Sequence, residues 1–170
     1  HQIEITTLIR EGFLVSPKTY VIDCGVKDQL SGVSRKGNDF DMDEVEAIMN
    51  RKVINEAVVD NWIEKAGDRK TVVFCSTIKH AEDLLLEFLE ADINAEMVTG
   101  ETPKPDRAKI LNDLTYGELR VVVNVAVLTE GFDAPPLSCI VLTRPCSQKG
   151  TMVQMIGRGL LTIDPEEFPG

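Results

Sequence analysis

Small polar residues recur in this 170-residue chain at the points where apolar runs stop. Hydroxyl groups, and backbone N–H groups near the start of a helix, are well suited to binding phosphate oxygens. Helix caps and turns use the same residue types, so each position taken singly is expected to be a cap. Taken together they predict an edge that binds the phosphates of a nucleotide or of a nucleic-acid backbone. The residues are Ser76, Thr77, Thr99, Gly100, Thr129, Gly131, Asp133, Thr143 and Arg144.

The chain lacks the patterns of a self-contained phosphate-transfer enzyme. It contains no Gly-x-x-x-x-Gly-Lys-Ser/Thr loop and no Gly-x-Gly-x-x-Gly fingerprint. Its two histidines, His1 and His80, form no obvious acid–base pair, and His80 is expected at the surface near the start of a helix. The sequence therefore argues against an independent enzyme.

Apolar runs alternate with helical patterns from Thr71 onward. Short continuous apolar runs are typical of strands buried on both faces of a parallel sheet. Strands separated by helices predict an α/β fold with right-handed crossovers, in which ligands bind beyond the carboxyl ends of the strands. Strands are expected at residues 71–75, 95–98, 119–125 and 139–142, and helices near residues 81–88, 105–114 and 150–160.

The first 70 residues follow a different pattern. Thr19 to Cys24 is rich in β-branched and aromatic residues and predicts a short strand, whereas residues 27–40 are polar and predict a loop. Asp41 is the expected N-cap of a helix that ends near Met49, and Glu44 completes a capping-box spacing.

A second helix is expected from about Ile54 to Gly67. Its apolar residues recur every four positions, and Trp62 lies among them. Trp62 is therefore expected to anchor the core; stacking on a nucleic-acid base is the alternative.

The net charge of −10 restricts the ways in which this chain binds nucleic acid. A free-standing protein that holds nucleic acid by charge is normally basic. Any such contact is therefore expected to be local and shared with a neighbouring domain.

Composition otherwise indicates a globular protein, with 43% hydrophobic and 27% charged residues. No apolar run is long enough to cross a membrane. The four cysteines show no Cys-x-x-Cys spacing, so they predict free thiols, no zinc site and a cytoplasmic location.

Four segments, in order, resemble the later motifs of superfamily 2 helicases. The resemblance is greatest to DEAD/DEAH-related proteins of the restriction-helicase or RadD-like type. The matching segments are residues 72–77 with His80 and Ala81 for motif IV, residues 99–102 with Arg107 for the part that follows, residues 127–135 for motif V and residues 154–161 for motif VI.

The resemblance implies the second RecA-like domain of an ATP-dependent helicase or translocase, a P-loop NTPase-like fold lacking the P-loop. Residues 1–40 would be an interdomain linker with a first strand, residues 41–70 a helical extension, and residues 71–170 the RecA-like domain. An upstream RecA-like domain would carry the Walker A and DEAD/DEAH motifs and hold most of the ATP and Mg²⁺.

The resemblance also implies roles for individual residues. Arg158 and Gln154 would be catalytic, and Gly131, Asp133 and Gly157 would approach ATP. The nucleic-acid backbone, with DNA favoured over RNA, would contact Ser76, Thr77, Thr99, Gly100 and Thr129.

Motif VI departs from the family pattern at one position. Leu161 stands where the family has its second arginine, and leucine cannot donate to phosphate. Arg107 and Arg144 are candidates to compensate, although both are expected to be solvated surface side chains. The departure keeps an alternative open, a catalytically silent RecA-like module that binds nucleic acid or a partner protein.

Overall fold

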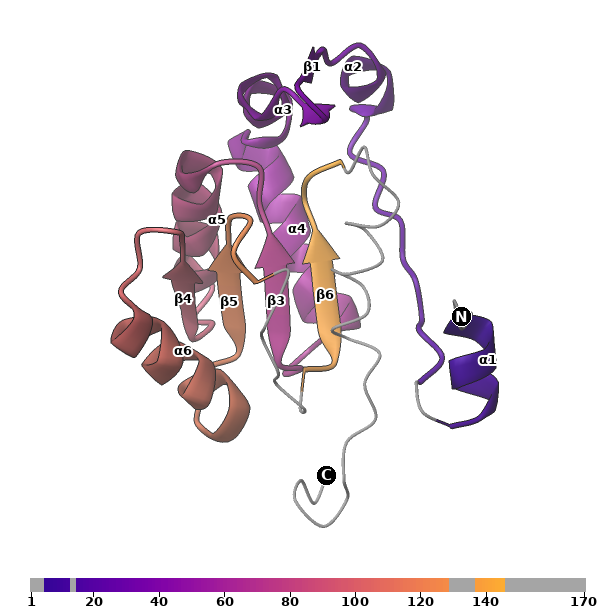
Figure 1. Cartoon of the computed structure of the whole chain (residues 1–170). Coiled ribbons are helices and arrows are strands. Elements are labelled where there is room, and N and C mark those ends of the chain that lie inside the picture. The colour runs from indigo at the N-terminus through magenta and orange to yellow at the C-terminus, as the bar shows by residue number, and fades with distance from the viewer. Residues whose placement is uncertain (1–4, 13–14, 129–136, 146–170) are drawn as a thin grey trace.

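A four-stranded parallel sheet forms the centre of the computed structural model, which describes residues 5–12, 15–128 and 137–145 (Figure 1). The strands are β3 Thr71–Phe74, β4 Ala95–Val98, β5 Val121–Asn124 and β6 Cys139–Leu142. Their order is β4-β5-β3-β6, so β3 pairs with β5 on one side and with β6 on the other. The predicted α/β fold and its four strands are confirmed.

Helices cover both faces of this sheet (Figure 1). They are α4 Lys52–Lys65, α5 Ile78–Glu90 and α6 Lys104–Tyr116. Side chains alternate along each strand, so Val72 and Phe74 pack with Leu114 of α6, whereas Val73 packs with Phe88 of α5 on the opposite face. α4 packs into the same layer as α5, and α6 covers the opposite face, so the sheet is buried on both sides. The helices expected at residues 81–88 and 105–114 are confirmed, and the one expected at residues 150–160 lies outside the described residues.

The helices before the sheet begin and end close to their predicted positions. Asp41 caps α3, Met42–Met49, by accepting from the backbone N–H groups of Asp43 and Glu44. The expected capping box is wrong, because the Glu44 carboxylate instead accepts from the backbone N–H and hydroxyl of Ser34. At the end of α4, Gly67 has φ +64° and donates to the carbonyl of Trp62, as expected for a C-terminal glycine.

The strand predicted at Thr19 to Cys24 is wrong, since the structure has no regular element there. Val21 is 90% exposed and Tyr20 is exposed as well, and β-forming residues become a strand only when a neighbouring strand pairs with them. The loop predicted at residues 27–40 is also partly wrong. The elements there and before are α1 Ile5–Arg10, α2 Lys27–Ser31, β1 Arg35–Lys36 and β2 Asp39–Phe40, the last two forming an antiparallel hairpin.

Within the part of the chain that the structure describes, no helix is both long and apolar enough to span a membrane. The same residues contain no group of three potential ligands placed to hold a metal ion. Cys75 is a buried free thiol, and burial raises its pKa to about 12, so it acts as a small apolar side chain.

Trp62 is a core residue, as predicted. It is 5% exposed, meets Phe88 edge to face at a centroid distance of 5.7 Å, and donates its indole N–H to the Thr71 hydroxyl at 2.8 Å. These contacts join α4, α5 and β3 in one layer, and leave no ring face for stacking on a base.

Replacing Trp62 with alanine is expected to lower the free energy of unfolding by about 3–5 kcal/mol, because it leaves a cavity and removes the hydrogen bond that the Thr71 hydroxyl accepts. Urea unfolding measures the change. Ile63→Ala is the matched control, since Ile63 is the next residue and is exposed, and it should cost less than about 1 kcal/mol. Equal losses in both variants would contradict the assignment of Trp62 to the core.

Candidate functional site

The carboxyl ends of the parallel strands bring polar residues to one edge of the sheet. Ser76 and Thr77 follow β3, Thr99 and Gly100 follow β4, and Thr143 follows β6. The structure therefore gathers the described members of the predicted edge. Thr129, Gly131, Asp133, Gln154, Gly157, Arg158 and Leu161 lie outside the described residues.

His80 is buried beside this edge, so its predicted surface position is wrong. It is 1% exposed, and its Nδ1 lies 2.9 Å from the Ser76 hydroxyl. Burial lowers the pKa of His80 to about 4, although the carboxylates of Glu46 and Asp83 act in the opposite direction. The imidazole is therefore neutral at pH 7 and holds Ser76. One pattern could have revealed this, because His80, Leu84 and Phe88 recur every four residues along the buried stripe of α5.

Thr77 caps α5 and contacts α3. Its hydroxyl accepts from the backbone N–H of His80 at 3.1 Å and donates to the Glu46 carboxylate at 2.5 Å. Nearby, Asn50 donates to Asp83 at 2.7 Å, and Lys79 pairs with the same carboxylate at 2.8 Å. The lower pKa of Asp83 follows first from its hydrogen bond with Lys79 and then from that with Asn50. Polar contacts thus attach α3 to the first turns of α5.

The turn after β4 is held by hydroxyls and by an arginine. The Thr99 backbone N–H donates to the Thr102 hydroxyl at 2.9 Å, and the Thr99 hydroxyl accepts from the Glu101 N–H at 3.2 Å. Arg107 donates to the Thr99 carbonyl at 3.2 Å, and its Nε is buried without a hydrogen-bond partner among the described residues. Gly100 is exposed, and a methyl group at this position would approach Val127 Cγ1 no closer than 3.9 Å.

Arg107 and Arg144 are not the solvated surface arginines that the sequence predicts. Arg107 braces the turn after β4 through its bond to the Thr99 carbonyl. The Arg144 side chain is only 7% exposed and forms an ion pair with Asp39 of β2, which ties the hairpin to the end of β6. Each guanidinium therefore donates to an acceptor within the fold instead of to solvent alone. Neither acceptor could be identified from the sequence around the arginine.

Sequence reasoning missed Asn124, the last residue of β5. Asn124 is fully buried, donates to the Val73 carbonyl at 2.9 Å and accepts from the Leu128 backbone N–H at 3.4 Å. It thereby joins β3 to the start of the segment that resembles motif V. An asparagine inside the run of valines at residues 121–125 was the available signal.

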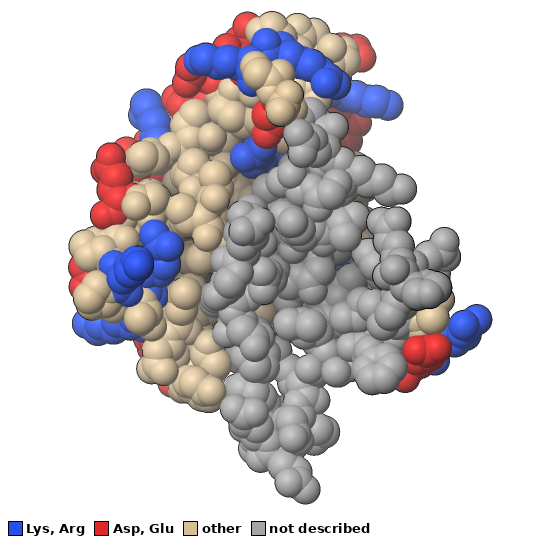
Figure 2. Space-filling view, viewed as in Figure 1, with Lys and Arg blue, Asp and Glu red and all other residues tan. Residues whose placement is uncertain are grey.

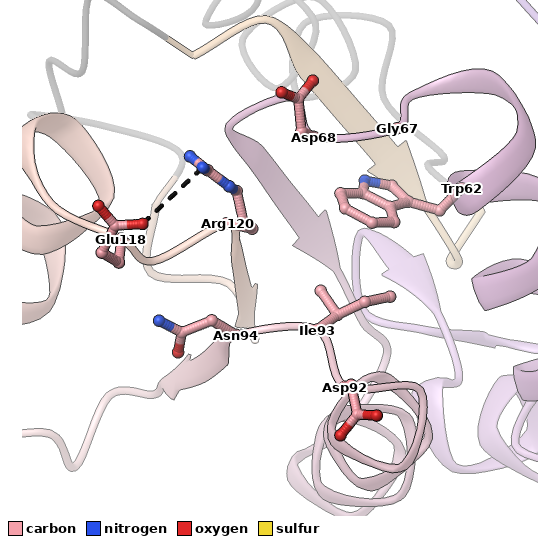
Figure 3. Close-up of a pocket in the computed structure, with 8 residues that line it drawn as sticks. All are labelled: Trp62, Gly67, Asp68, Asp92, Ile93, Asn94, Glu118 and Arg120. Carbon is pink, nitrogen blue, oxygen red and sulfur yellow. Dashed lines mark ion pairs between the residues drawn. The ribbon is translucent and has the colours of Figure 1, made fainter.

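A separate hollow of about 340 Å³ lies at the opposite, amino-terminal ends of the strands (Figure 3). The Glu118–Arg120 ion pair, with an N···O distance of 4.0 Å, lies at its wall, and Trp62 is already bonded to Thr71. None of the predicted phosphate-binding residues lines it. The carboxyl edge is therefore the better candidate site.

The charge on this part of the molecule is mixed. Figure 2 shows Lys and Arg side chains interspersed with Asp and Glu side chains at the end that carries α3 and the β1–β2 hairpin. α3 itself contributes Asp43, Glu44 and Glu46. Any phosphate contact at this edge therefore depends on individual hydrogen-bond donors rather than on a broad basic surface.

His80 gives the fold a pH dependence with a definite sign. An unfolded histidine titrates near pH 6.5, so between about pH 6.5 and 4 the unfolded chain binds a proton that the folded chain excludes. This contribution to stability is complete above pH 6.5 and declines as the pH falls toward 4. Urea unfolding at pH 7 and pH 5 should show a loss of about 2 kcal/mol from this residue.

His80→Asn is the matched variant, because it keeps a neutral polar side chain but removes the titrating ring. It should lose less stability than the wild type between pH 7 and pH 5. Parallel losses in the two proteins would show that His80 does not cause the dependence.

Comparisons with known proteins agree with this geometry. The family described as helicase conserved C-terminal domain matches residues 51–160. The putative ATP-dependent helicase IRC3 of Saccharomyces cerevisiae is 33% identical over 138 residues, which cover 79% of this chain and 20% of that protein. The type I restriction enzyme EcoKI endonuclease subunit of Escherichia coli is 33% identical over 158 residues, covering 85% of this chain and 13% of that protein. The chain spans less than a third of the length of the curated relatives that it matches.

Solved structures share the fold. The C-terminal domain of the DEAD-box protein Dbp5 superimposes with a TM-score of 0.55 at 19% identity, covering 64% of each chain. The Hef helicase domain of Pyrococcus furiosus gives a TM-score of 0.52 at 23% identity, covering 68% of this chain and 24% of that one. The sheet is therefore RecA-like, as predicted. With residues 51–160 matched and the strand order in place, the chain belongs to the helicase conserved C-terminal domain family of superfamily 2.

Proposed function

We propose that this chain is the C-terminal motor domain of an ATP-dependent nucleic-acid helicase or translocase, with DNA as its substrate. The observation that supports it most is the match of residues 51–160 to the helicase family, a span that includes the first three motif-like segments and all of the fourth except its last residue, Leu161. The first of those segments runs through β3 and past its carboxyl end, and the second follows the carboxyl end of β4, so both reach one edge of the RecA-like sheet. Ligands of parallel α/β sheets bind at that edge.

The nucleic-acid side of the proposed site uses hydroxyl and backbone donors. Ser76, Thr77, Thr99 and Gly100 lie at the described edge, and Thr129 is assigned by resemblance alone. Such groups bind phosphate oxygens without reading bases. The protein is therefore proposed to move along or remodel a strand without sequence preference.

The ATP side of the proposed site is divided between two domains. Gly131, Asp133 and Gly157 would approach the nucleotide, and Gln154 and Arg158 would reach it across the interdomain cleft. The chain has no phosphate-binding loop of its own, so a second RecA-like domain would hold the phosphates and Mg²⁺. Arg158 would offset negative charge on the γ-phosphate during transfer, an effect worth roughly 10³–10⁵ in rate in related phosphoryl-transfer systems.

A catalytically silent module that binds nucleic acid or a partner protein is the second candidate. Leu161 favours it, because motif VI then has one arginine where the family has two. The net charge of −10 favours it too, since the chain by itself attracts nucleic acid poorly. The two candidates differ in whether Arg158 supports turnover.

In the protein that contains both motor domains, Arg158→Ala is expected to reduce nucleic-acid-stimulated ATP hydrolysis by at least about 10³-fold, because it removes the charge that reaches the γ-phosphate. Turnover is measured with single- and double-stranded DNA and with RNA, and DNA should stimulate it most. The isolated chain is the control and should show negligible turnover. Clear magnesium-dependent turnover by the isolated chain would refute a divided site, and a silent two-domain protein would favour the second candidate.

Leu161→Arg in the same two-domain protein is expected to raise DNA-stimulated turnover, because it restores a second donor to the phosphates. The initial rate at saturating ATP and DNA is the quantity to compare. Leu160→Arg adds the same charge one position away and should give no such increase. If the wild type and Leu161→Arg turn over equally, the position does not limit hydrolysis.

A further inference from the structure

The hydroxyl of Thr77 is already engaged by a carboxylate from outside the predicted motif. A threonine hydroxyl has one proton to donate and two lone pairs that accept. In this structure the proton goes to Glu46 Oε2 at 2.5 Å, and a lone pair accepts from the backbone N–H of His80 at 3.1 Å. Phosphate oxygens accept hydrogen bonds. A nucleic-acid phosphate bound to the Thr77 hydroxyl therefore needs the same proton that the hydroxyl now donates to Glu46.

Glu46 is held in this position by the packing of its helix. Val45, the preceding residue of α3, is fully buried, and Asn50 at the end of the helix donates to Asp83 of α5. Glu46 is itself a half-buried residue, and in such a position the repulsion between two negative charges is screened less than in bulk water. A phosphate at Thr77 would therefore lose a donor and also meet a negative charge.

Other hydroxyls at this edge are engaged differently. The Thr99 hydroxyl accepts from the Glu101 backbone N–H, and the described residues offer its proton no acceptor. Ser76 is buried, and its hydroxyl is hydrogen-bonded to Nδ1 of the His80 ring. Thr77 is thus the hydroxyl whose donor is taken by a carboxylate from another helix.

We propose that Glu46 competes with nucleic-acid phosphate for the Thr77 hydroxyl, so that α3 lowers the affinity of this edge for a strand. The proposal rests on the proposed function, because it assigns a phosphate of the nucleic acid to Thr77. Binding then requires the Glu46 side chain to leave the hydroxyl. The acidic helical extension acts as an internal competitor of the substrate.

The test measures binding of a fluorescently labelled single-stranded DNA oligonucleotide to the full chain by anisotropy. Glu46→Ala removes both the charge and the acceptor and should tighten binding by about tenfold, a change typical of one charged hydrogen bond. Glu46→Gln keeps an acceptor oxygen without the charge and should give a smaller gain. Thermal unfolding verifies that each variant is folded. If Glu46→Ala proves unstable, the more conservative Glu46→Gln variant can still be used to test the proposal.

Two controls distinguish competition at Thr77 from a general effect of charge. Glu64→Ala makes the same change on the exposed surface of α4, near the amino ends of the strands, and should leave affinity unchanged. In a Thr77→Val background, the gain from Glu46→Ala should fall sharply, because the released hydroxyl is missing. An equal gain in Glu64→Ala, or an undiminished gain beside Thr77→Val, would overturn the competition.

The outcomes also separate this proposal from the function on which it rests. Measurable wild-type binding with no gain in either Glu46 variant overturns the competition and leaves the nucleic-acid function standing. Absence of binding in the wild type and in every variant overturns the nucleic-acid contact at this edge, and the competition with it. Binding that is detectable only in the Glu46 variants supports both.

Discussion

β3 hydrogen-bonds to β5 along one side and to β6 along the other, and all four of its residues are buried. The neighbouring strands run parallel to it, so their carboxyl ends lie at the same edge of the sheet. That pairing brings Ser76 and Thr77 to the edge reached by the turns after β4 and β6. It also fixes which side chains face α6 and which face α4 and α5. The candidate site is thus a consequence of the parallel pairing of one buried strand.

Hydrogen bonds of buried polar side chains stabilise this edge of the sheet. Asn124 and Thr143 both donate to backbone carbonyls of β3, at Val73 and Phe74 respectively. The neutral ring of His80 holds Ser76. An unpaired polar group in such a position would cost free energy, so each of these hydrogen bonds restricts where the following turn can run. The turns after the strands therefore start from defined positions.

The two helices before the sheet, α3 and α4, both contact α5. α4 supplies Trp62 to the same apolar layer as α5, whereas α3 reaches α5 through polar contacts and places Glu46 on Thr77. The family match begins at residue 51, close to the start of α4. Apolar packing joins α4 to α5, whereas the contacts that join α3 to α5 include hydrogen bonds between polar side chains. Of the two helices, α3 is thus the one that places a carboxylate at this edge.

Local pattern determined much of this protein. The four strands were predictable because strands buried on both faces are continuous apolar runs, and Asp41 was predictable as an N-cap because capping depends on neighbouring residues. Only the tertiary structure decided that Thr19 to Cys24 is not a strand, since strand formation needs a partner that the segment itself does not specify. It also decided the partners of the site residues. Thr77 meets Glu46 from 31 residues away, and Arg144 meets Asp39 from 105 residues away. Such contacts arise from chain packing, which no local spacing encodes.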